Sequence, residues 1–249
     1  MTDLRFGLLG KTLKHSFSKD FFEKYFSQEK INASYENIEV DSSENLRLFF
    51  QNDIFRFRGV NVTIPYKESV LPFLDELTPE AMEIGAVNTI KVVDTKLIGH
   101  NTDQFGFHQA IKPFLTNQHE KALVFGTGGA SKAVAYVLKN LGIDVLYISR
   151  SQKGNMIFSY DDINQYMLNA CKLLVNTTPV GMFPQVDEIL PLPYEFLSPQ
   201  HLAVDLIYNP QETLFLKQAK TQGAMTLNGM TMLREQALEA WRFWNNGKH

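Results

Sequence analysis

The sequence predicts an α/β protein with two domains. Strand-like and helix-like patterns alternate along the chain, and from residue 122 onward the strands become wholly apolar. Such alternation is typical of sheets covered by helices, and continuous apolar runs are typical of parallel strands buried on both faces. With 249 residues, 44% of them hydrophobic, the chain is long enough to build two cores.

The first hundred residues are expected to alternate strands with helices. Phe22, Tyr25 and Phe26 recur on one side of a helix, which predicts an amphipathic segment facing a core. The strand patterns occupy residues 5–10, 34–40, 60–64, 88–93 and 96–101, the last two forming a hairpin. The helical patterns occupy residues 19–30, 44–52, 67–76 and 79–84.

The second half predicts a doubly wound, Rossmann-like domain, because short apolar strands alternate there with an amphipathic helix. Strands are expected at residues 122–126, 144–150, 172–178 and 202–208, and a helix at 130–142. A last helix at 229–244 either closes this domain or returns to the first. Its inward-facing residues are expected to be Leu233, Ala237, Ala240, Trp241 and Trp244.

Composition excludes several classes of function. The net charge of −3 gives no basic footprint for nucleic acid or an anionic membrane. Cys171 is the only cysteine, and no two histidines have the spacing of a zinc-binding helix, so no disulfide or metal site is expected. The first residues read as a strand rather than a signal peptide, and no apolar run is long enough to span a membrane. We therefore expect a cytoplasmic protein without nucleic-acid or membrane partners.

Residues 59–67 (GVNVTIPYK) have two different faces. Successive side chains of a strand point to opposite sides, so Asn61 and Thr63 are expected to share one face and the valines the other. A proline then ends the strand, and Lys67 follows. The polar face is either an ordinary solvated surface or part of a ligand site.

A glycine-rich loop joins the strand at 122–126 to the helix at 130–142. Gly126, Gly128 and Gly129 permit a tight turn and a close approach of the backbone to a pyrophosphate. The helix that follows offers unpaired N–H groups and a positive dipole end. Ser131 replaces the third glycine of the usual fingerprint and is small enough for close packing. The loop is predicted to bind a dinucleotide, the alternative being a purely structural turn.

The residues after the next strand bear on which dinucleotide binds. NAD-binding domains usually carry a carboxylate there, whereas an arginine suits the 2′-phosphate of NADP. This chain has Arg150 between Ser149 and Ser151, followed by Lys153 and without an acid. The position favours NADP, the alternative being an ordinary surface arginine.

Lys67 and Asp103 form a candidate acid–base pair. Hydride transfer to a ketone also requires a proton donor beside the forming alkoxide, and a lysine close to a carboxylate can fill that role. The alternative for Asp103 is that it is the N-cap of a helix starting at Gln104, and one aspartate can serve both purposes.

At this point the chain resembles the shikimate dehydrogenase family over essentially its whole length. The resemblance rests on eight motifs in order: HSFS, GVNVTIPYK, GAVNT, NTDQFG, GTGGAS, NTTPVGM, DLIYNP and GMTMLREQA. It implies an NADP-dependent oxidoreductase that reversibly reduces 3-dehydroshikimate to shikimate, in the pathway to chorismate and the aromatic amino acids. The implied partner is this small-molecule substrate, and the implied assembly is a monomer or homodimer.

The resemblance also implies roles for individual residues. Lys67 and Asp103 match the catalytic pair. The positions that match the substrate ligands are Ser16 and Ser18 for the carboxylate, with Tyr208 near it, and Asn61, Thr63, Asn88, Asp103 and Gln236. The positions that match the cofactor site are Gly126, Thr127, Gly128, Gly129, Ala130, Ser131, Ser149, Arg150, Ser151, Lys153, Leu206 and Gly229. The family analogy assigns residues 1–103 plus 229–249 to the substrate domain and 104–228 to the NADP domain.

Two departures from the family pattern matter. Lys19 stands where the family often has proline, and Ser18 is then an alternative cap for the following helix. Ser149 stands where the family usually has asparagine, which weakens the preference for NADP over NAD. The alternative functions are a quinate/shikimate dehydrogenase that uses NAD or NADP, a catalytically silent dinucleotide-binding paralogue, and a folate-linked dehydrogenase of similar architecture.

Overall fold

The computed structural model describes residues 4–13, 16–151 and 154–246. The chain divides into two compact units. The first unit comprises Met1–Thr102 with Ala237–His249, and the second comprises Asp103–Gln236. Each unit is built on a six-stranded sheet of its own.

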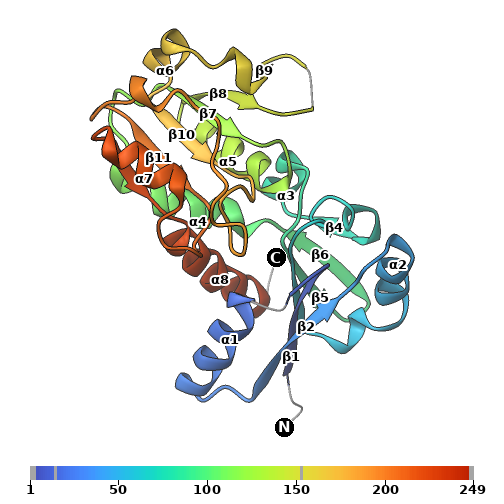
Figure 1. The fold of residues 1–249 in the computed structure, drawn as a ribbon. Helices are drawn as coiled ribbons and strands as arrows, with labels where there is room; N and C mark the ends of the chain where they lie inside the picture. Colours follow the sequence, from blue (N-terminus) through green and yellow to red (C-terminus); the bar gives the residue numbers. More distant parts are fainter. Residues whose placement is uncertain (1–3, 14–15, 152–153, 247–249) are drawn as a thin grey trace. The chain divides into compact units, whose positions relative to one another are not determined.

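The sheet of the first unit is mixed (Figure 1). Its strands are β1 (Leu4–Gly10), β2 (Ala33–Glu39), β3 (Gly59–Val62), β4 (Glu76–Leu77), β5 (Thr89–Val93) and β6 (Lys96–His100). They lie in the order β2-β1-β3-β5-β6-β4. β1 pairs in parallel with both β2 and β3, whereas β5 runs antiparallel to β3 and β6. The predicted hairpin of β5 with β6 is therefore confirmed.

Helices cover both faces of this sheet. They are α1 (Phe17–Gln28), α2 (Ser43–Asn52), α3 (Pro79–Ile84) and the last part of α8 (Met230–Asn245). Val60 of β3 packs in a cluster with Leu46 of α2. On the other face, Phe6 of β1 packs in a cluster with Phe22 of α1 and Trp244 of α8. The alternation expected along β3 is confirmed, but both faces of the strand are buried.

One predicted helix of this unit is wrong. Residues 67–70 form turns, Leu71–Phe73 is a single 3₁₀ turn, and Glu76–Leu77 is the strand β4. The physical reason is Pro72, which lacks the N–H that a helix interior requires and disfavours helical backbone at Leu71 before it. The leucines of this segment lie in turns and pack on the core from there.

The sheet of the second unit is entirely parallel and doubly wound. Its strands are β7 (Lys121–Phe125), β8 (Asp144–Ile148), β9 (Ile157–Phe158), β10 (Leu173–Asn176), β11 (Leu202–Asp205) and β12 (Met225–Leu227). The order β12-β11-β10-β7-β8-β9 places the first strand in the middle, so the chain winds outward in both directions. The predicted Rossmann-like fold is confirmed.

The helices of the second unit pack on both faces of that sheet (Figure 1). They are α4 (Thr102–Ile111), α5 (Gly129–Asn140), α6 (Gln165–Ala170) and α7 (Leu214–Thr221). Phe107 of α4 and Val134 of α5 belong to one core cluster, and Leu168 of α6 and Phe215 of α7 belong to the other. The sequence patterns missed α6 and α7, as well as β4, β9 and β12.

The final helix α8 contributes to the cores of both units. Met232 packs in the second unit, while Ala237, Ala240 and Trp244 pack in the first. The Trp244 indole N–H donates to the Ile90 carbonyl of β5 at 3.0 Å. These three buried residues were predicted to face inward, whereas the other two residues predicted with them, Leu233 and Trp241, are half-buried. None of the helices in the described part of the chain combines the length and apolarity needed to cross a membrane.

Candidate active site

Asn61 is buried in the middle of a hydrogen-bonded network in the first unit. Its side-chain amide donates to the Asn88 carbonyl oxygen at 3.3 Å and to Thr89 Oγ1 at 3.0 Å. Its Oδ1 accepts the hydroxyl of Tyr35 at 2.9 Å. Asn61 therefore lies on a polar face, as predicted, but that face is buried rather than solvated. Both of its N–H donors are used within the protein, so only Oδ1 has capacity left, as an acceptor.

The Asn88 side chain connects β5 to the start of α4. Its Oδ1 accepts the backbone N–H of Thr102 at 2.7 Å, and its amide donates to Thr102 Oγ1 at 3.0 Å. The helix thus begins at Thr102, and Asp103 lies in its first turn, instead of capping a helix that starts at Gln104. Asp103 is 5% exposed. Asn88 therefore holds the residue directly before Asp103.

The loop before β5 also holds the backbone of Lys67. The Val87 N–H donates to the Lys67 carbonyl oxygen at 2.7 Å, and the Asn101 amide donates to the Ala86 carbonyl oxygen at 2.8 Å. Lys67 is half-buried. The segment 86–88 therefore makes backbone or side-chain hydrogen bonds both to Lys67 and to the two residues before Asp103.

Two hydroxyl groups of the first unit make no hydrogen bond within the described residues. Ser16 Oγ is buried and makes no hydrogen bond among the described residues. Ser16 is the N-cap residue of α1, yet its hydroxyl does not accept an N–H of the helix. Thr63 follows β3, is half-buried, and its hydroxyl has no hydrogen-bond partner in the described part of the chain. A buried hydroxyl without a partner costs free energy, so Ser16 is suited to a bound ligand.

Ser18 lies in the first turn of α1 and does not cap the helix, because Ser16 occupies the N-cap position. Its side chain lies near the hydroxyl of Tyr35, a residue that the sequence patterns did not single out. The only available signal for Tyr35 was a hydroxyl-bearing residue inside the strand pattern at 34–40. Neither Tyr35 nor Thr89 nor Thr102 was predicted as part of the site.

In the second unit, Gln236 of α8 lies against Gly106 of α4. A Cβ atom added at Gly106 would stand 3.0 Å from both the backbone nitrogen and the Cβ of Gln236, and 2.5 Å from the Met232 carbonyl oxygen. The Gln236 side chain donates to the Leu233 carbonyl oxygen at 2.9 Å. Glycine in NTDQFG is therefore required for the close approach of these two helices.

The glycine-rich loop turns tightly at Gly126 and is open at Gly128. Gly126 has a φ of +104°, and a Cβ there would stand 2.8 Å from Thr177 Oγ1. A Cβ at Gly128, in contrast, would meet no atom within 4 Å, so the loop is open above this residue. Gly128 is also the N-cap residue of α5 and supplies no capping side chain. The first N–H groups of α5 are thus not capped by a side chain, as at an anion-binding helix terminus.

Ser131 is buried in the first turn of α5, and its hydroxyl donates to the Gly128 carbonyl oxygen at 2.6 Å. Thr127, Gly129 and Ala130 are half-buried along the same turn. The serine that replaces the third fingerprint glycine therefore packs inward and closes the turn with its hydroxyl.

Arg150 is exposed directly after β8, where a ligand can reach it. Ser149 is buried, and its Oγ accepts the Ser151 N–H at 3.4 Å. Burial raises the pKa of Tyr160, and the charge of Arg150 partly opposes this shift, which places the arginine near that ring. Lys153, predicted for the same site, lies outside the described residues.

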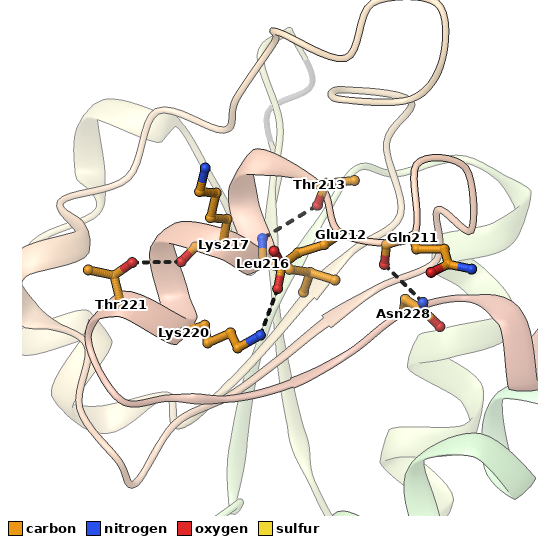
Figure 2. A network of polar contacts seen from close by, with 8 residues as sticks. All are labelled: Gln211, Glu212, Thr213, Leu216, Lys217, Lys220, Thr221 and Asn228. Atoms are coloured by element: carbon orange, nitrogen blue, oxygen red, sulfur yellow. Dashed lines mark hydrogen bonds and ion pairs between the residues drawn. The ribbon is translucent and has the colours of Figure 1, made fainter.

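Leu206 and Gly229, predicted to lie beside the nicotinamide, are in contact. A Cβ at Gly229 would collide with the Leu206 carbonyl, and the Gly229 N–H donates to the Ile207 carbonyl oxygen at 3.0 Å. Figure 2 shows a second hydrogen bond between the segments that contain these two residues: the Asn228 amide donates to the Gln211 carbonyl oxygen at 2.9 Å. Tyr208 follows in the same loop and is half-buried.

Asp205, the last residue of β11, is the centre of a buried hydrogen-bond network. It was not predicted as a site residue. Its carboxylate accepts from Thr213 Oγ1 at 2.7 Å, the Ile207 N–H at 3.0 Å and the Asn176 amide at 3.1 Å. Thr213 is also the N-cap of α7, accepting the Leu216 N–H at 3.4 Å (Figure 2). Burial raises the pKa of Asp205 to about 6. The sequence signal for this pair was an amide and an acid at the ends of two apolar strands, in the motifs NTTPVGM and DLIYNP.

No group of His, Cys, Asp or Glu residues within the described ranges has the arrangement of a metal site. The buried Cys171 has a pKa raised to about 11 by burial, so its thiol stays protonated and unreactive.

The chain is similar to one family of known proteins. The family model described as the shikimate dehydrogenase substrate binding domain matches residues 8–90. A shikimate dehydrogenase (NADP(+)) of Clostridium beijerinckii is 37% identical over 249 residues, covering 96% of this chain and 91% of that protein.

Two solved structures extend the comparison. The shikimate 5-dehydrogenase of Thermus thermophilus in complex with NADP(H) and shikimate is 34% identical, with a TM-score of 0.82 over 97% of this chain and 93% of that one. The quinate dehydrogenase of Corynebacterium glutamicum in complex with NAD is 28% identical, with a TM-score of 0.83 over 98% and 94% of the two chains.

Proposed function

This chain belongs to the shikimate dehydrogenase family, and we propose that it catalyses the reversible, NADPH-dependent reduction of 3-dehydroshikimate to shikimate. The observation in the structure that carries this proposal is Ser16, whose buried hydroxyl has no partner among the described residues. Its position at the start of α1 suits a hydroxyl that donates to the carboxylate of the substrate.

The remaining substrate ligands are assigned by the chemistry of their side chains. Ser18 shares the carboxylate with Ser16, and Tyr208 lies near it. Thr63 reads a ring hydroxyl, since its own hydroxyl has no protein partner in the described chain. Asn61, whose two donors are already used, accepts from a substrate hydroxyl through Oδ1. Asn88, Asp103 and Gln236 complete the set of hydroxyl ligands.

The proton transfer is assigned to Lys67, with Asp103 as its partner. NADPH supplies the hydride when it is bound. Lys67 donates the proton to the alkoxide oxygen in the reductive direction and takes it back in the oxidative direction. Asp103 is buried, and its carboxylate orients the ammonium group and supports its positive charge.

The cofactor is assigned to the second unit. The open turn above Gly128 and the start of α5 suit the pyrophosphate, and Arg150 suits the 2′-phosphate of NADP. We assign substrate binding to residues 1–103 with 229–249, and NADP binding to residues 104–228. The full set of proposed cofactor contacts is Gly126, Thr127, Gly128, Gly129, Ala130, Ser131, Ser149, Arg150, Ser151, Lys153, Leu206 and Gly229.

A second candidate function is a quinate/shikimate dehydrogenase that uses NAD. Ser149 favours it, because a serine at that position reaches less far toward the adenine ribose than the family's usual asparagine. Arg150 favours NADP instead, because its guanidinium can form a bidentate, charge-assisted pair with a phosphate.

Steady-state kinetics of the purified protein test both functions. Shikimate and quinate are each assayed with NADP and with NAD, in the oxidative direction. The proposal expects the highest kcat/KM for shikimate with NADP. Turnover of quinate with NAD at a higher kcat/KM would establish the second candidate, and absence of all turnover would establish a silent paralogue.

A further inference from the structure

Asp205 and Asn176 form a buried pair at the carboxyl ends of two neighbouring strands. They are the last residues of β11 and β10, are paired in the register of these strands, and are both fully buried. The Asn176 amide donates to Asp205 Oδ1 at 3.1 Å, and the Asn176 carbonyl oxygen accepts the Leu206 N–H at 3.0 Å. Open α/β sheets bind their ligands at the carboxyl ends of the strands. The pair therefore lies at the edge of the sheet where a ligand is expected.

The strand order indicates which half of a dinucleotide approaches this pair. The glycine-rich loop follows the central strand β7. Arg150 follows β8, which lies on one side of β7, whereas β10 and β11 lie on the other side. A dinucleotide with its 2′-phosphate at Arg150 and its pyrophosphate at the glycine-rich loop then has its nicotinamide half on the side of β10 and β11.

The Asp205 carboxylate holds the loop that follows β11. Oδ1 accepts the Ile207 N–H at 3.0 Å, and Oδ2 accepts the Thr213 hydroxyl at 2.7 Å, so both ends of residues 206–213 are attached to one side chain. The Ile207 carbonyl oxygen accepts the Gly229 N–H at 3.0 Å. Asp205 therefore supports the backbone on which Leu206 and Gly229 meet.

The orientation of the Asn176 amide is fixed by its other partners. Its Oδ1 accepts the Thr178 N–H at 3.0 Å and the Thr178 hydroxyl at 2.7 Å. Turning the amide around would place this oxygen against the Asp205 carboxylate, which is also an acceptor. The Asn176 amide therefore donates to Asp205, and the pair joins the loops that follow β10 and β11.

We propose that Asp205, held by Asn176, is a positioning residue for the nicotinamide end of the cofactor, because it fixes the backbone at Leu206 and Gly229. This inference rests on the function proposed above. Hydride transfer requires close alignment of the reacting atoms, and a displacement of about 1 Å can cost about 10²-fold in rate. Loss of the Asp205 carboxylate is therefore expected to slow turnover much more than it weakens binding of the adenine end.

The test compares wild type with Asp205→Ala and Asp205→Asn. Alanine removes the acceptor of three donors, whereas asparagine keeps an oxygen for Ile207 and Asn176 and can donate its amide to Thr213. The probe is 2′-phospho-ADP-ribose, which is NADP without the nicotinamide. Its calorimetric titration counts the folded cofactor sites, and kcat for shikimate oxidation at saturating NADP is then expressed per site, so that unfolded molecules do not lower it.

Asp205→Ala is expected to lower kcat per site by about ten-fold to a hundred-fold. Its Kd for 2′-phospho-ADP-ribose is expected to stay within about two-fold of wild type, because the glycine-rich loop and Arg150 are separate from the pair. Asp205→Asn is expected to stay within about three-fold of wild type in kcat per site, since it keeps the hydrogen bonds that position the loop.

The control is His201→Ala, at the amino end of the same strand. His201 directly precedes β11, is 1% exposed, and its ring hydrogen-bonds to the Leu168 carbonyl oxygen at 2.9 Å. Its loss should lower the thermal stability of the fold yet leave kcat per site unchanged. Should Asp205→Ala give no folded sites, Asn176→Ala removes only the donor to Asp205 among the groups that contact it, and is expected to lower kcat per site about ten-fold.

Three results overturn the inference: a kcat per site near that of wild type in the alanine variant, equal damage in Asp205→Asn, or a Kd for 2′-phospho-ADP-ribose that rises as far as kcat falls. An equal fall of kcat per site in His201→Ala also overturns it, because any loss of stability would then suffice. A wild type that binds 2′-phospho-ADP-ribose and does not oxidise shikimate overturns the proposed function instead, so the two failures are distinguishable.

Discussion

Gly106 of α4 and Gln236 of α8 lie so close that a single methyl group on the glycine would stand 3.0 Å from the Gln236 backbone nitrogen. Asp103 precedes Gly106 by three residues, and residues so spaced share one side of a helix. The glycine therefore sets the separation between two helices that each carry a proposed substrate ligand.

We predict that Gly106→Ala raises the KM for shikimate about ten-fold, because α8 must move away and carry Gln236 with it. Alanine favours a helix over glycine by about 1 kcal/mol, but overpacking against a backbone carbonyl costs about 1–3 kcal/mol, so thermal stability should fall. Gln109→Ala, on the exposed side of α4, is the control. A KM that does not move in Gly106→Ala would show that Gln236 is not a ligand.

Lys67→Ala is predicted to lower kcat by about 10²–10⁴-fold, the usual contribution of general acid–base catalysis. The KM for shikimate should change much less, because the hydroxyl and carboxylate ligands remain. Lys24→Ala removes an exposed lysine from α1 and should leave both constants unchanged. Steady-state rates decide the matter, and a near-normal kcat in the Lys67 variant would refute the assignment.

Arg150→Ala is predicted to raise the KM for NADP by about ten-fold to a hundred-fold while barely affecting the KM for NAD, since a hydrogen bond to a charged group contributes about 1.5–3 kcal/mol. The effect should shrink at high salt, because Arg150 is exposed and screened. Lys139→Ala removes another exposed positive charge from the second unit as a control. A wild type that already prefers NAD would contradict the prediction.

Asp205 should make the stability of the fold depend on pH. Its pKa rises from 3.8 in the unfolded chain to about 6 in the fold. The folded carboxyl thus binds its proton more tightly, so its contribution to stability is complete below about pH 4 and is lost as the pH rises through about 6. The loss is on the order of 3 kcal/mol, at about 1.4 kcal/mol per pKa unit.

Asp205→Asn is the variant that isolates this effect. An asparagine oxygen can still accept from Ile207 and Asn176, and its amide can donate to Thr213. Denaturant unfolding without cofactor, between about pH 4 and pH 7, should show wild type losing stability relative to the variant. The lowered pKa values of His119 and His201 are common to both proteins and cancel in this difference. Parallel pH profiles would contradict the prediction.

Much of the fold was predictable from local patterns. Each strand expected from the sequence is present, with ends that differ by up to three residues, as for the strand expected at 202–208 and found at Leu202–Asp205. The glycine-rich loop lies between β7 and α5, as expected. The helix expected at residues 67–76 is wrong for a local reason too, because Pro72 interrupts it.

The sequence by itself determined the fold class, the position of the glycine-rich loop and the residue types available for chemistry. These features depend on the periodicity of apolar residues and on the backbone freedom of glycine, and both are properties of residues close together in the chain. The assignments of Lys67, Asp103 and the other site residues stay predictions. Only the tertiary structure decided which polar groups are already satisfied and which are not. Tyr35 reaches Asn61 across 26 residues and Asn176 reaches Asp205 across 29, and no local pattern carries such a pairing. Hydrogen bonds between distant strands form only after the sheets bring the strands together. The partners of a buried polar side chain are therefore set by the fold, and not by the residues next to it in the chain.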